Sequence, residues 1–258
     1  SNKLLLNLVI KNQDKIKLIR VTNSFFKNFL IKSGIKEEKI FQIPLTVNDI
    51  FQKYDEEKCK EFRNEFNLPQ NSFIVGSFHK DGDGFGEGMK PKFIKGPDIF
   101  LETLKILKKN INNLFVLLTA PARGYVKQGL DNLGIEYKHF KNLKFEELPK
   151  LYNCLDTYLI SSRDEGGPTG MFEAMASGVP VVTTKVGHAF DSIKNGKNGF
   201  SVDVDDYQKL AESVEAIYKN IDLKKKFITE SLIEASKQKK DKHKLLWISF
   251  FNKLKKSD

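Results

Sequence analysis

Two glutamates, Glu165 and Glu173, enclose seven residues of a loop rich in glycine and proline. The intervening sequence, GGPTGMF, predicts a polar loop that runs into a helix beginning near Thr169. Helical side chains lean towards the N-terminus, so Glu173 is expected to lie over the first turn. Backbone N–H groups at a helix start bind anions, and phosphate is the natural occupant. Carboxylates repel phosphate but accept hydrogen bonds from hydroxyls attached to it, which indicates a ribose and a sugar.

The same loop suits a ligand that lies close to the main chain. Pro168 fits the first helical position because it has no N–H group to satisfy, and Gly167 and Gly170 carry no side chain that would hold a ligand away. A simpler interpretation makes Glu165 a surface charge and lets Glu173 interact only with the helix start. The pair, the glycines and the following EAMASGVPVV together favour a binding site.

The segment EGGPTGMFEAMASGVPVV resembles the E-x7-E signature of the family 4 retaining glycosyltransferases, which have the GT-B fold of two facing Rossmann-like domains. The likeness includes the setting, because strand-like apolar runs precede and follow the segment. The resemblance implies that Glu165 contacts the donor sugar and Glu173 the ribose. It also implies that the amides of Thr169 and Gly170 hold the distal phosphate. Transfer would retain the anomeric configuration and would need no metal.

Several cations are candidates for the donor diphosphate. IKGPDIFLETL resembles the KG motif of the same family, so Lys95 is expected to stabilise charge on the departing nucleotide. The family usually has an arginine just after the glycine of the first strand, where this chain has Ser77, and Lys80 is the expected replacement. Arg123, in TAPARGY after the second strand, is a further candidate, with a surface carboxylate as its alternative partner.

Two further segments resemble parts of the donor site. By position, Phe140 and Lys141 would line the nucleobase pocket, and Gly187 matches a glycine near the donor sugar. The sequence DGDGFG invites comparison with a calcium loop. Its fifth and twelfth positions are Phe85 and Lys92, however, where that loop needs oxygen ligands. We therefore expect no metal site.

Composition limits the classes of function. With 40% hydrophobic residues the chain can form a real core, and no apolar run approaches the 18 residues of a membrane span. Cys59 and Cys154 lack metal-ligand spacing and indicate free thiols in a reducing cytoplasm. Of the net charge of +10, residues 237–258 supply +6, from eight Lys and two Asp. Because the charge is local, no nucleic acid partner is expected.

The pattern along the chain predicts four parts. Residues 1–50 read as two strand-like runs around one helix and are expected to be an incomplete tail of an N-terminal acceptor-binding domain. Residues 51–70 predict a charged linker helix. Residues 71–220 alternate short apolar runs with helical segments, which predicts an α/β, doubly wound parallel sheet that is Rossmann-like. By resemblance this is the C-terminal half of a GT-B fold. Residues 221–258 predict basic helices.

The last helix has two interpretations. KLLWISFFNKLKK places most of its apolar side chains on one face, with lysines at both ends. Taken alone, such a helix indicates peripheral contact with a membrane surface, at the inner face of the membrane for a cytoplasmic protein. The family resemblance instead implies a helix that returns across the cleft and packs on the N-terminal domain.

The leading expectation is the donor half of a glycosyltransferase. It would bind a nucleoside diphosphate sugar such as a UDP-sugar, with no cofactor, and act in polysaccharide biosynthesis. The acceptor, a glycan, lipid or protein, would be held by a largely missing N-terminal domain, so this fragment alone is expected to be inactive. The alternatives are a nucleotide-sugar-binding module without turnover and a nucleotide-sugar epimerase. An adaptor for membranes or nucleic acid rests on the basic tail alone.

Overall fold

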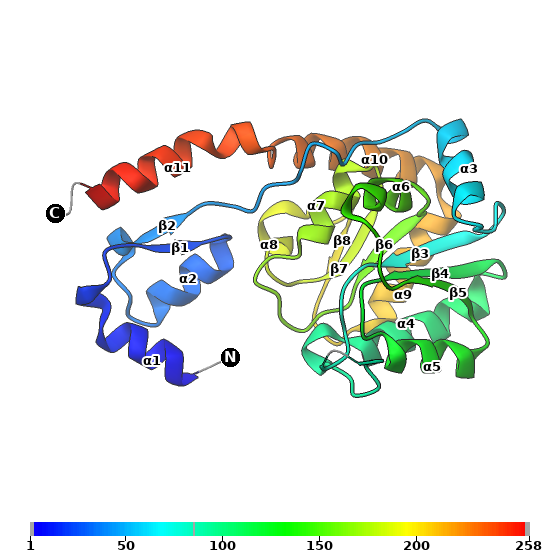
Figure 1. Ribbon diagram of the computed structural model, residues 1–258, viewed down its shortest axis with the longest axis horizontal. Coiled ribbons are helices and arrows are strands. Elements are labelled where there is room, and N and C mark those ends of the chain that lie inside the picture. Colours follow the sequence, from blue (N-terminus) through cyan, green and yellow to red (C-terminus); the bar gives the residue numbers. More distant parts are fainter. Residues whose placement is uncertain (1–2, 85, 256–258) are drawn as a thin grey trace.

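The structure is a computed structural model that describes residues 3–84 and 86–255. It contains a small two-stranded N-terminal part and a larger six-stranded sheet, which lie side by side (Figure 1). Phe85, on which the rejection of a calcium loop partly depends, lies outside the described residues, as do residues 1–2 and 256–258 at the ends of the first and last predicted parts.

The larger sheet is parallel throughout and has the strand order β5-β4-β3-β6-β7-β8. Its strands are β3 (Phe73–Ser77), β4 (Leu114–Thr119), β5 (Glu136–Phe140), β6 (Thr157–Ile160), β7 (Val181–Thr184) and β8 (Phe200–Val202). The order along the chain reverses between β3 and β6. Ligands of open α/β sheets bind outside the carboxyl ends of the strands at such a reversal. The loops that follow β3 and β6 are therefore the ones to inspect.

Both faces of this sheet are covered by helices and buried. Successive side chains of each strand point to opposite sides and so contribute to two separate core clusters. Ile74 belongs to one core cluster, whereas its neighbours Phe73 and Val75 belong to the other. The first cluster includes residues of α3 (Glu56–Glu65), α6 (Leu148–Asn153) and α7 (Thr169–Ala176). The second includes residues of α4 (Pro97–Asn110), α5 (Gly124–Leu133), α9 (Tyr207–Lys219) and α10 (Ile221–Ser236). This arrangement confirms the predicted doubly wound parallel sheet.

The start of α4 fixes the loop after β3 against the loop after β6. Gly96 precedes α4 in a left-handed conformation, with φ of 62°, and an added Cβ there would lie 1.9 Å from the carbonyl oxygen of Ser161. The Ser161 hydroxyl donates to the Gly96 carbonyl at 2.8 Å. Only glycine permits so close an approach in this conformation. Lys95, the residue before it, ends the short 3₁₀ turn Phe93–Lys95 and is thereby held beside the β6 loop.

The N-terminal part is a two-stranded parallel sheet with helices. It comprises α1 (Lys3–Lys11), β1 (Ile19–Val21), α2 (Ser24–Lys32) and β2 (Ile40–Gln42), with 3₁₀ turns at Gln13–Lys15 and Glu37–Lys39. The final helix, α11 (Lys240–Lys255), continues from α10 along the top of the molecule and passes over this part (Figure 1). There the guanidinium of Arg20 lies 5.1 Å from the centre of the Trp247 ring, and Phe41 meets Phe250 edge to face at 5.6 Å.

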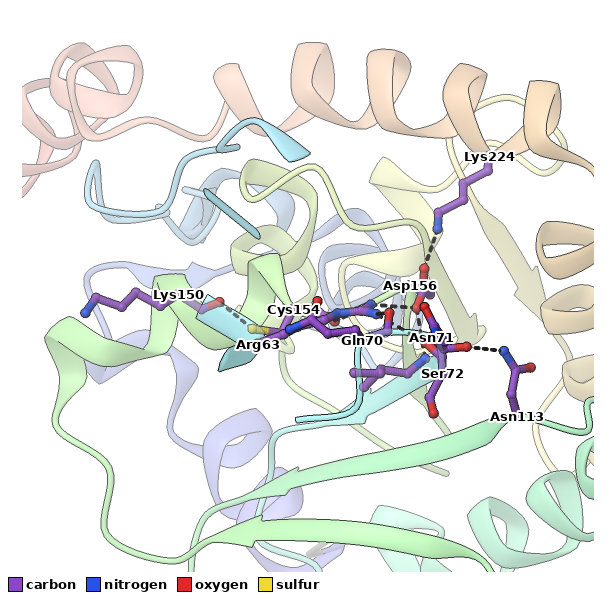
Figure 2. A network of polar contacts seen from close by, with 10 residues as sticks. Arg63, Gln70, Asn71, Ser72, Asn113, Lys150, Cys154, Asp156 and Lys224 are labelled. Carbon is purple, nitrogen blue, oxygen red and sulfur yellow. Dashed lines mark hydrogen bonds and ion pairs between the residues drawn. The ribbon is translucent and has the colours of Figure 1, made fainter. Parts of the chain in front are cut away.

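A polar network joins two helices to the amino ends of the central strands, which lie opposite the strand ends that form the candidate site (Figure 2). Arg63 of α3 donates to the carbonyl of Cys154 and to the carboxylate of Asp156, both at 2.9 Å. The ammonium of Lys224, from α10, pairs with the other oxygen of Asp156 at 2.5 Å. Asp156 also accepts from the backbone N–H of Ile74 in β3. One carboxylate thus connects α3, α10 and the starts of two central strands.

The structure corrects several expectations about elements. Residues 1–50 contain the additional helix α1, and residues 189–192 form a short helix, α8 (Ala189–Ser192), that was not predicted. The strand β8 was missed because its three residues are only partly buried and follow a glycine-rich turn. Pro168 is the N-cap of α7 and does not take the first helical position. Within the described ranges, no helix is both long enough and apolar enough to span a bilayer.

Candidate functional site

Lys95 and Glu165 meet at the reversal point of the sheet. The ammonium of Lys95 lies 2.7 Å from Oε1 of Glu165, and their side chains are 26% and 12% exposed. Ser162, just after β6, donates to the same oxygen at 2.9 Å. The two strand-end loops therefore bring together a cation and a carboxylate that are 70 residues apart in sequence. Because both contacts use Oε1, Oε2 of Glu165 is the oxygen that a ligand hydroxyl could approach.

The backbone around Glu165 is supported from two directions. A Cβ on Gly187, which has φ of 50°, would lie 2.7 Å from the carbonyl oxygen of Glu165, so this glycine permits close packing of the two loops. From the N-terminal part, Thr22 and Asn23 donate to the carbonyl of Gly166 at 2.7 and 3.0 Å. The structure thus places Gly187 beside the Glu165 loop and fixes that loop against the end of β1.

The first turn of α7 provides the expected backbone donors. Within the part of the chain that the structure describes, the N–H groups of Thr169 and Gly170 donate to no protein group. Thr169 is exposed and Gly170 is partly exposed. Free amides at the positive end of a helix dipole attract an anion. With Lys95 close to the preceding loop, this end of α7 has the electrostatics of a phosphate site.

Glu173 lies one turn into α7 and is held by a tyrosine. The hydroxyl of Tyr152, in α6, donates to Oε2 of Glu173 at 2.9 Å. Burial raises the pKa of the Glu173 carboxyl, and the hydrogen bond from Tyr152 opposes this by stabilising the ionised form. Glu173 is therefore a partly buried acceptor whose ionisation depends on its partner.

The structure corrects the expectation that Arg123 presents a cation to a ligand. Arg123 is 1% exposed, and its Nε lies 3.0 Å from the carboxylate of Asp81. The guanidinium also donates at 2.7 Å to the carbonyls of Ser77 and His79. Buried charges need paired, hydrogen-bonded surroundings, and here the protein itself supplies them. Arg123 therefore stabilises the conformation of the loop after β3 through contacts with residues of that loop.

The remaining predicted residues lie along the rim of the sheet. The ammonium of Lys80 donates to the carbonyl of Gly84 in its own loop. Lys141 is exposed and pairs with Glu87 at 3.2 Å. Phe140 is partly buried and meets Phe66 edge to face at 5.4 Å, so its ring packs into the core beneath the strand end. These contacts leave the roles predicted for Lys80, Phe140 and Lys141 as predictions.

His188, beside Gly187, joins the candidate site to the N-terminal part. It is 1% exposed, and its Nε2 lies 3.4 Å from the backbone nitrogen of Leu45, which donates to it. Burial lowers the pKa of the imidazole to about 4, so the ring is neutral at pH 7 and can accept this hydrogen bond. A Cβ on Gly167 would lie 2.7 Å from the His188 ring, which explains a glycine there.

A cavity of about 690 Å³ opens between Glu165 and the N-terminal part. Glu165, Gly166 and Gly167 line one side of it. The other sides are mostly apolar and are formed by residues of α1, β1 and α2, among them Leu6, Val21 and Phe26. Space beside the Glu165 carboxylate is therefore bounded by both parts of the molecule.

Sequence reasoning missed the residues that hold the two glutamates. Ser162 and Tyr152 contact Glu165 and Glu173 directly, and Tyr158 lies against the same turn of α7. Their sequence signal is weak, since a serine after a strand and tyrosines in apolar runs occur in any core. In the described ranges no group of three or more His, Cys, Asp or Glu is placed to hold a metal ion.

Comparisons with known proteins identify the family. The family model for "Glycosyl transferases group 1" matches residues 91–232. The capsular polysaccharide biosynthesis glycosyltransferase CapM of Staphylococcus aureus is 36% identical over 66 residues, 26% of this chain and 17% of that protein. Spore coat protein SA of Bacillus subtilis is 31% identical over 134 residues, 47% of this chain and 35% of that protein. The match thus spans well under half of these relatives.

Solved structures share the fold. Anabaena Alr3699/HepE in complex with UDP-glucose has a TM-score of 0.80 at 19% identity, over 98% of this chain and 68% of that one. WaaG, a glycosyltransferase involved in lipopolysaccharide biosynthesis, has a TM-score of 0.70 at 17% identity, over 90% and 61%. The six-stranded parallel sheet with helices on both faces is therefore the arrangement of GT-B glycosyltransferases. By the extent of the family match, this chain belongs to the group 1 glycosyl transferases.

Proposed function

We propose that this chain binds the donor of a retaining, family 4 type sugar transferase, as the C-terminal, donor-binding half of a GT-B enzyme. The donor would be a nucleoside diphosphate sugar. The observation that carries the proposal is the 2.7 Å pair of Lys95 and Glu165 at the reversal point of the sheet, beside the free amides of α7. A cation, backbone donors and hydroxyl acceptors converge there, as such a donor requires.

In this proposal each group has one task. The amides of Thr169 and Gly170 hold the distal phosphate, and Glu173 accepts from the ribose hydroxyls. Glu165 accepts from the donor sugar, while Lys95 stabilises the negative charge that develops on the departing diphosphate. The bond between the anomeric carbon and the phosphate oxygen breaks, a bond to the acceptor oxygen forms on the same face of the sugar, and the proton of the acceptor hydroxyl passes to the departing diphosphate. Lys95 performs the electrostatic task that a metal performs in other transferases.

The acceptor in this proposal approaches from the N-terminal side. The 690 Å³ cavity supports this direction, because Glu165 lines one of its sides and the N-terminal part the others. The relative CapM is named for capsular polysaccharide biosynthesis, and HepE has been solved with UDP-glucose. We therefore propose a UDP-sugar as the first donor to test and a glycan acceptor of polysaccharide biosynthesis.

Calorimetric titration with UDP, GDP and ADP, and with their glucose conjugates, tests the donor site. We expect one nucleoside diphosphate to bind with one-to-one stoichiometry. Glu173→Gln should weaken that binding by about 1 to 3 kcal/mol, the usual value of a hydrogen bond to a charged group. Glu212→Gln, an exposed glutamate on α9, is the matched control and should leave affinity unchanged. If no nucleotide binds, the proposal is wrong.

The role of Glu165 has its own discriminating measurement. Glu165→Gln should weaken binding of the sugar conjugate more than binding of the free nucleoside diphosphate, because the amide oxygen of glutamine can still accept from Lys95 and keep it in place. Incubation of a labelled donor with acceptors, followed by NMR of the anomeric signal, tests the stereochemistry. A product of inverted configuration would contradict the retaining mechanism. An epimerised donor without transfer would favour an epimerase, and binding without any product a module without turnover.

A further inference from the structure

Two buried tyrosines converge on the first turn of α7. Tyr152 comes from α6 and Tyr158 from β6, and they are 1% and 2% exposed. Their rings pack edge to face, with centroids 5.4 Å apart. Burying a phenol hydroxyl is costly unless it is hydrogen-bonded, so packing alone would favour phenylalanine at both positions. Their hydroxyls therefore need a reason beyond filling the core.

One of the two hydroxyls holds Glu173, and the other accepts from the backbone. Tyr152 donates to Oε2 of Glu173 at 2.9 Å, and the backbone N–H of Phe78 donates to the hydroxyl oxygen of Tyr158 at 3.3 Å. Tyr152 has only one proton and gives it to Glu173. A hydrogen bond to a charged group is roughly twice as strong as one between neutral groups, so this contact holds the carboxylate in place.

Gly170 shows how closely the phenols approach the expected phosphate site. A Cβ at this position would lie 2.6 Å from the hydroxyl of Tyr158 and 3.0 Å from that of Tyr152. The absence of a side chain at Gly170 thus lets both phenol oxygens lie directly against the first turn of α7. Both phenols therefore lie beside the amides that we propose bind phosphate, and Tyr152 contacts the residue that we propose binds ribose.

We propose that Tyr152 is a positioning residue for nucleotide recognition: it holds Oε2 of Glu173 so that Oε1 faces the ribose hydroxyls. This inference rests on the proposed donor site. A flexible glutamate would lose side-chain entropy on binding, and the hydrogen bond removes that cost in advance. The recognised group is a vicinal diol, so a ligand without ribose gains nothing from the arrangement.

The test compares two ligands on the full chain. Tyr152→Phe should weaken binding of the nucleoside diphosphate that the wild-type protein binds by roughly tenfold, a typical loss for a hydrogen bond to a charged group. Binding of pyrophosphate, which has no ribose, should change by less than about twofold. Tyr158→Phe should have a smaller effect, because the Tyr158 hydroxyl accepts from the backbone of Phe78 whereas Tyr152 holds Glu173. Tyr54→Phe removes the same atom from a residue packed on the same core cluster and should affect neither ligand.

A double-mutant cycle and a pH series provide readouts that a purely structural role would not change. In a Glu173→Gln background, Tyr152→Phe should cause almost no further loss of nucleotide affinity. The ionisable side chains that face Glu173 are Tyr152 of α6 and Tyr158 of β6. Without the Tyr152 hydroxyl the Glu173 carboxylate is less stabilised, so nucleotide binding should fail at a higher pH as the solution is acidified.

Each outcome decides one question. If the wild-type protein binds no nucleoside diphosphate, the proposed function fails and the positioning role fails with it. If it binds and Tyr152→Phe binds equally well, only the positioning role is overturned. Equal losses for pyrophosphate and nucleotide would also overturn it, since they indicate a damaged fold. Should Tyr152→Phe fail to fold, Tyr152→Met, which also lacks the hydroxyl, takes its place in the same two-ligand comparison, and an unchanged nucleotide affinity overturns the role.

Discussion

At the scale of single residues, the candidate site contains an ion pair between Lys95 and Glu165, and the donor that we propose would contact both residues. Lys95 and Ser162 both contact Oε1 of Glu165, and both charged side chains are largely buried. An ion pair at such a place keeps Lys95 in position, because a lysine side chain otherwise samples many rotamers. For the donor that we propose, the ammonium is therefore already fixed between two strand-end loops before the diphosphate binds.

Lys95→Ala should weaken binding of the nucleoside diphosphate by about 1.5 to 3 kcal/mol, the range for a charge-assisted hydrogen bond. The dependence of affinity on salt concentration should also become weaker, because one cation fewer contacts the phosphates. Titrations at two ionic strengths measure both effects. Lys92→Ala removes the same charge from an exposed lysine of the same loop and serves as the control. If the two variants weaken binding equally, Lys95 contributes only to the general positive charge of the loop and does not contact the phosphates.

His188 makes stability depend on pH. Its pKa is lowered to about 4 by burial, whereas an unfolded histidine titrates near pH 6.5. The unfolded state therefore binds more protons between these values, and stability should fall as pH falls from about 6.5 to 4. The lowered pKa of His188 corresponds to a decrease on the order of 3 kcal/mol in the free energy of unfolding over this pH range.

His188→Gln should lose this dependence, since a glutamine can still accept from Leu45 and does not titrate. Urea unfolding of both proteins at pH 7 and pH 4.5 measures the difference, and other titrating groups cancel in the comparison. Parallel pH profiles for the two proteins would show that His188 is protonated as readily in the folded state as in the unfolded state.

At the scale of elements, the network around Asp156 holds the layers together on the side away from the candidate site. Arg63 and Asp156 are 14% and 18% exposed, so their pairing is mostly shielded from solvent. The same carboxylate holds Lys224 of α10 and the first part of β3. Relative placement of α3, α10, β3 and β6 thus depends on one side chain, and the strand-end loops inherit their positions from those strands.

Asp156→Ala should lower the free energy of unfolding by about 3 kcal/mol, because it leaves Arg63 and Lys224 without their shared partner. Lys150→Ala is the control in the same region. Lys150 pairs with Glu65, but both side chains are well exposed, and such pairs contribute about 0 to 1 kcal/mol. Chemical denaturation of the two variants provides the test. Similar losses would mean that the Asp156 network is as solvated as the surface pair.

At the scale of the whole molecule, the chain joins its two parts more than once. The segment after β2 leads from the N-terminal part to the six-stranded sheet, and α10 and α11 return in the opposite direction (Figure 1). Direct contacts add to this connection, since Phe25 of α2 stacks on Phe190 of α8 at 4.6 Å, and Ser24 donates from its backbone to Asp191 at 2.8 Å. The arrangement places the N-terminal part against the loop of Glu165.

Trp247→Ala should loosen α11 from the N-terminal part, because it removes the Arg20 stacking and the aromatic cluster with Phe250. The free energy that holds α11 on the N-terminal part should fall by about 1 to 2 kcal/mol. Hydrogen exchange of β1 and β2 measures it locally, and protection there should fall while β3 and β4 are unaffected. Leu245→Ala changes a residue of the same helix that is 76% exposed and should have no effect. Uniform loss of protection over both sheets would contradict a local role for α11.

The sequence by itself determined the elements whose signals are local. Apolar runs that alternate with helical segments over residues 71–220 predicted the parallel sheet and its covering helices, and the structure has β3 to β8 and α4 to α9 within those bounds. Glycines, proline and two glutamates at fixed spacing located the start of α7. Such signals arise because neighbouring residues in a strand or helix experience the same environment at a fixed period.

Only the tertiary structure decided which charged and polar groups face a ligand and which serve the core. Arg123 has the sequence setting of a ligand cation, but its partners Asp81 and Ser77 lie 42 and 46 residues away and bury it. Tyr152 reaches Glu173 across 21 residues, and Thr22 reaches Gly166 across 144. The exposure and ionisation of a side chain depend on what packs against it, and no local pattern in the sequence encodes that neighbour.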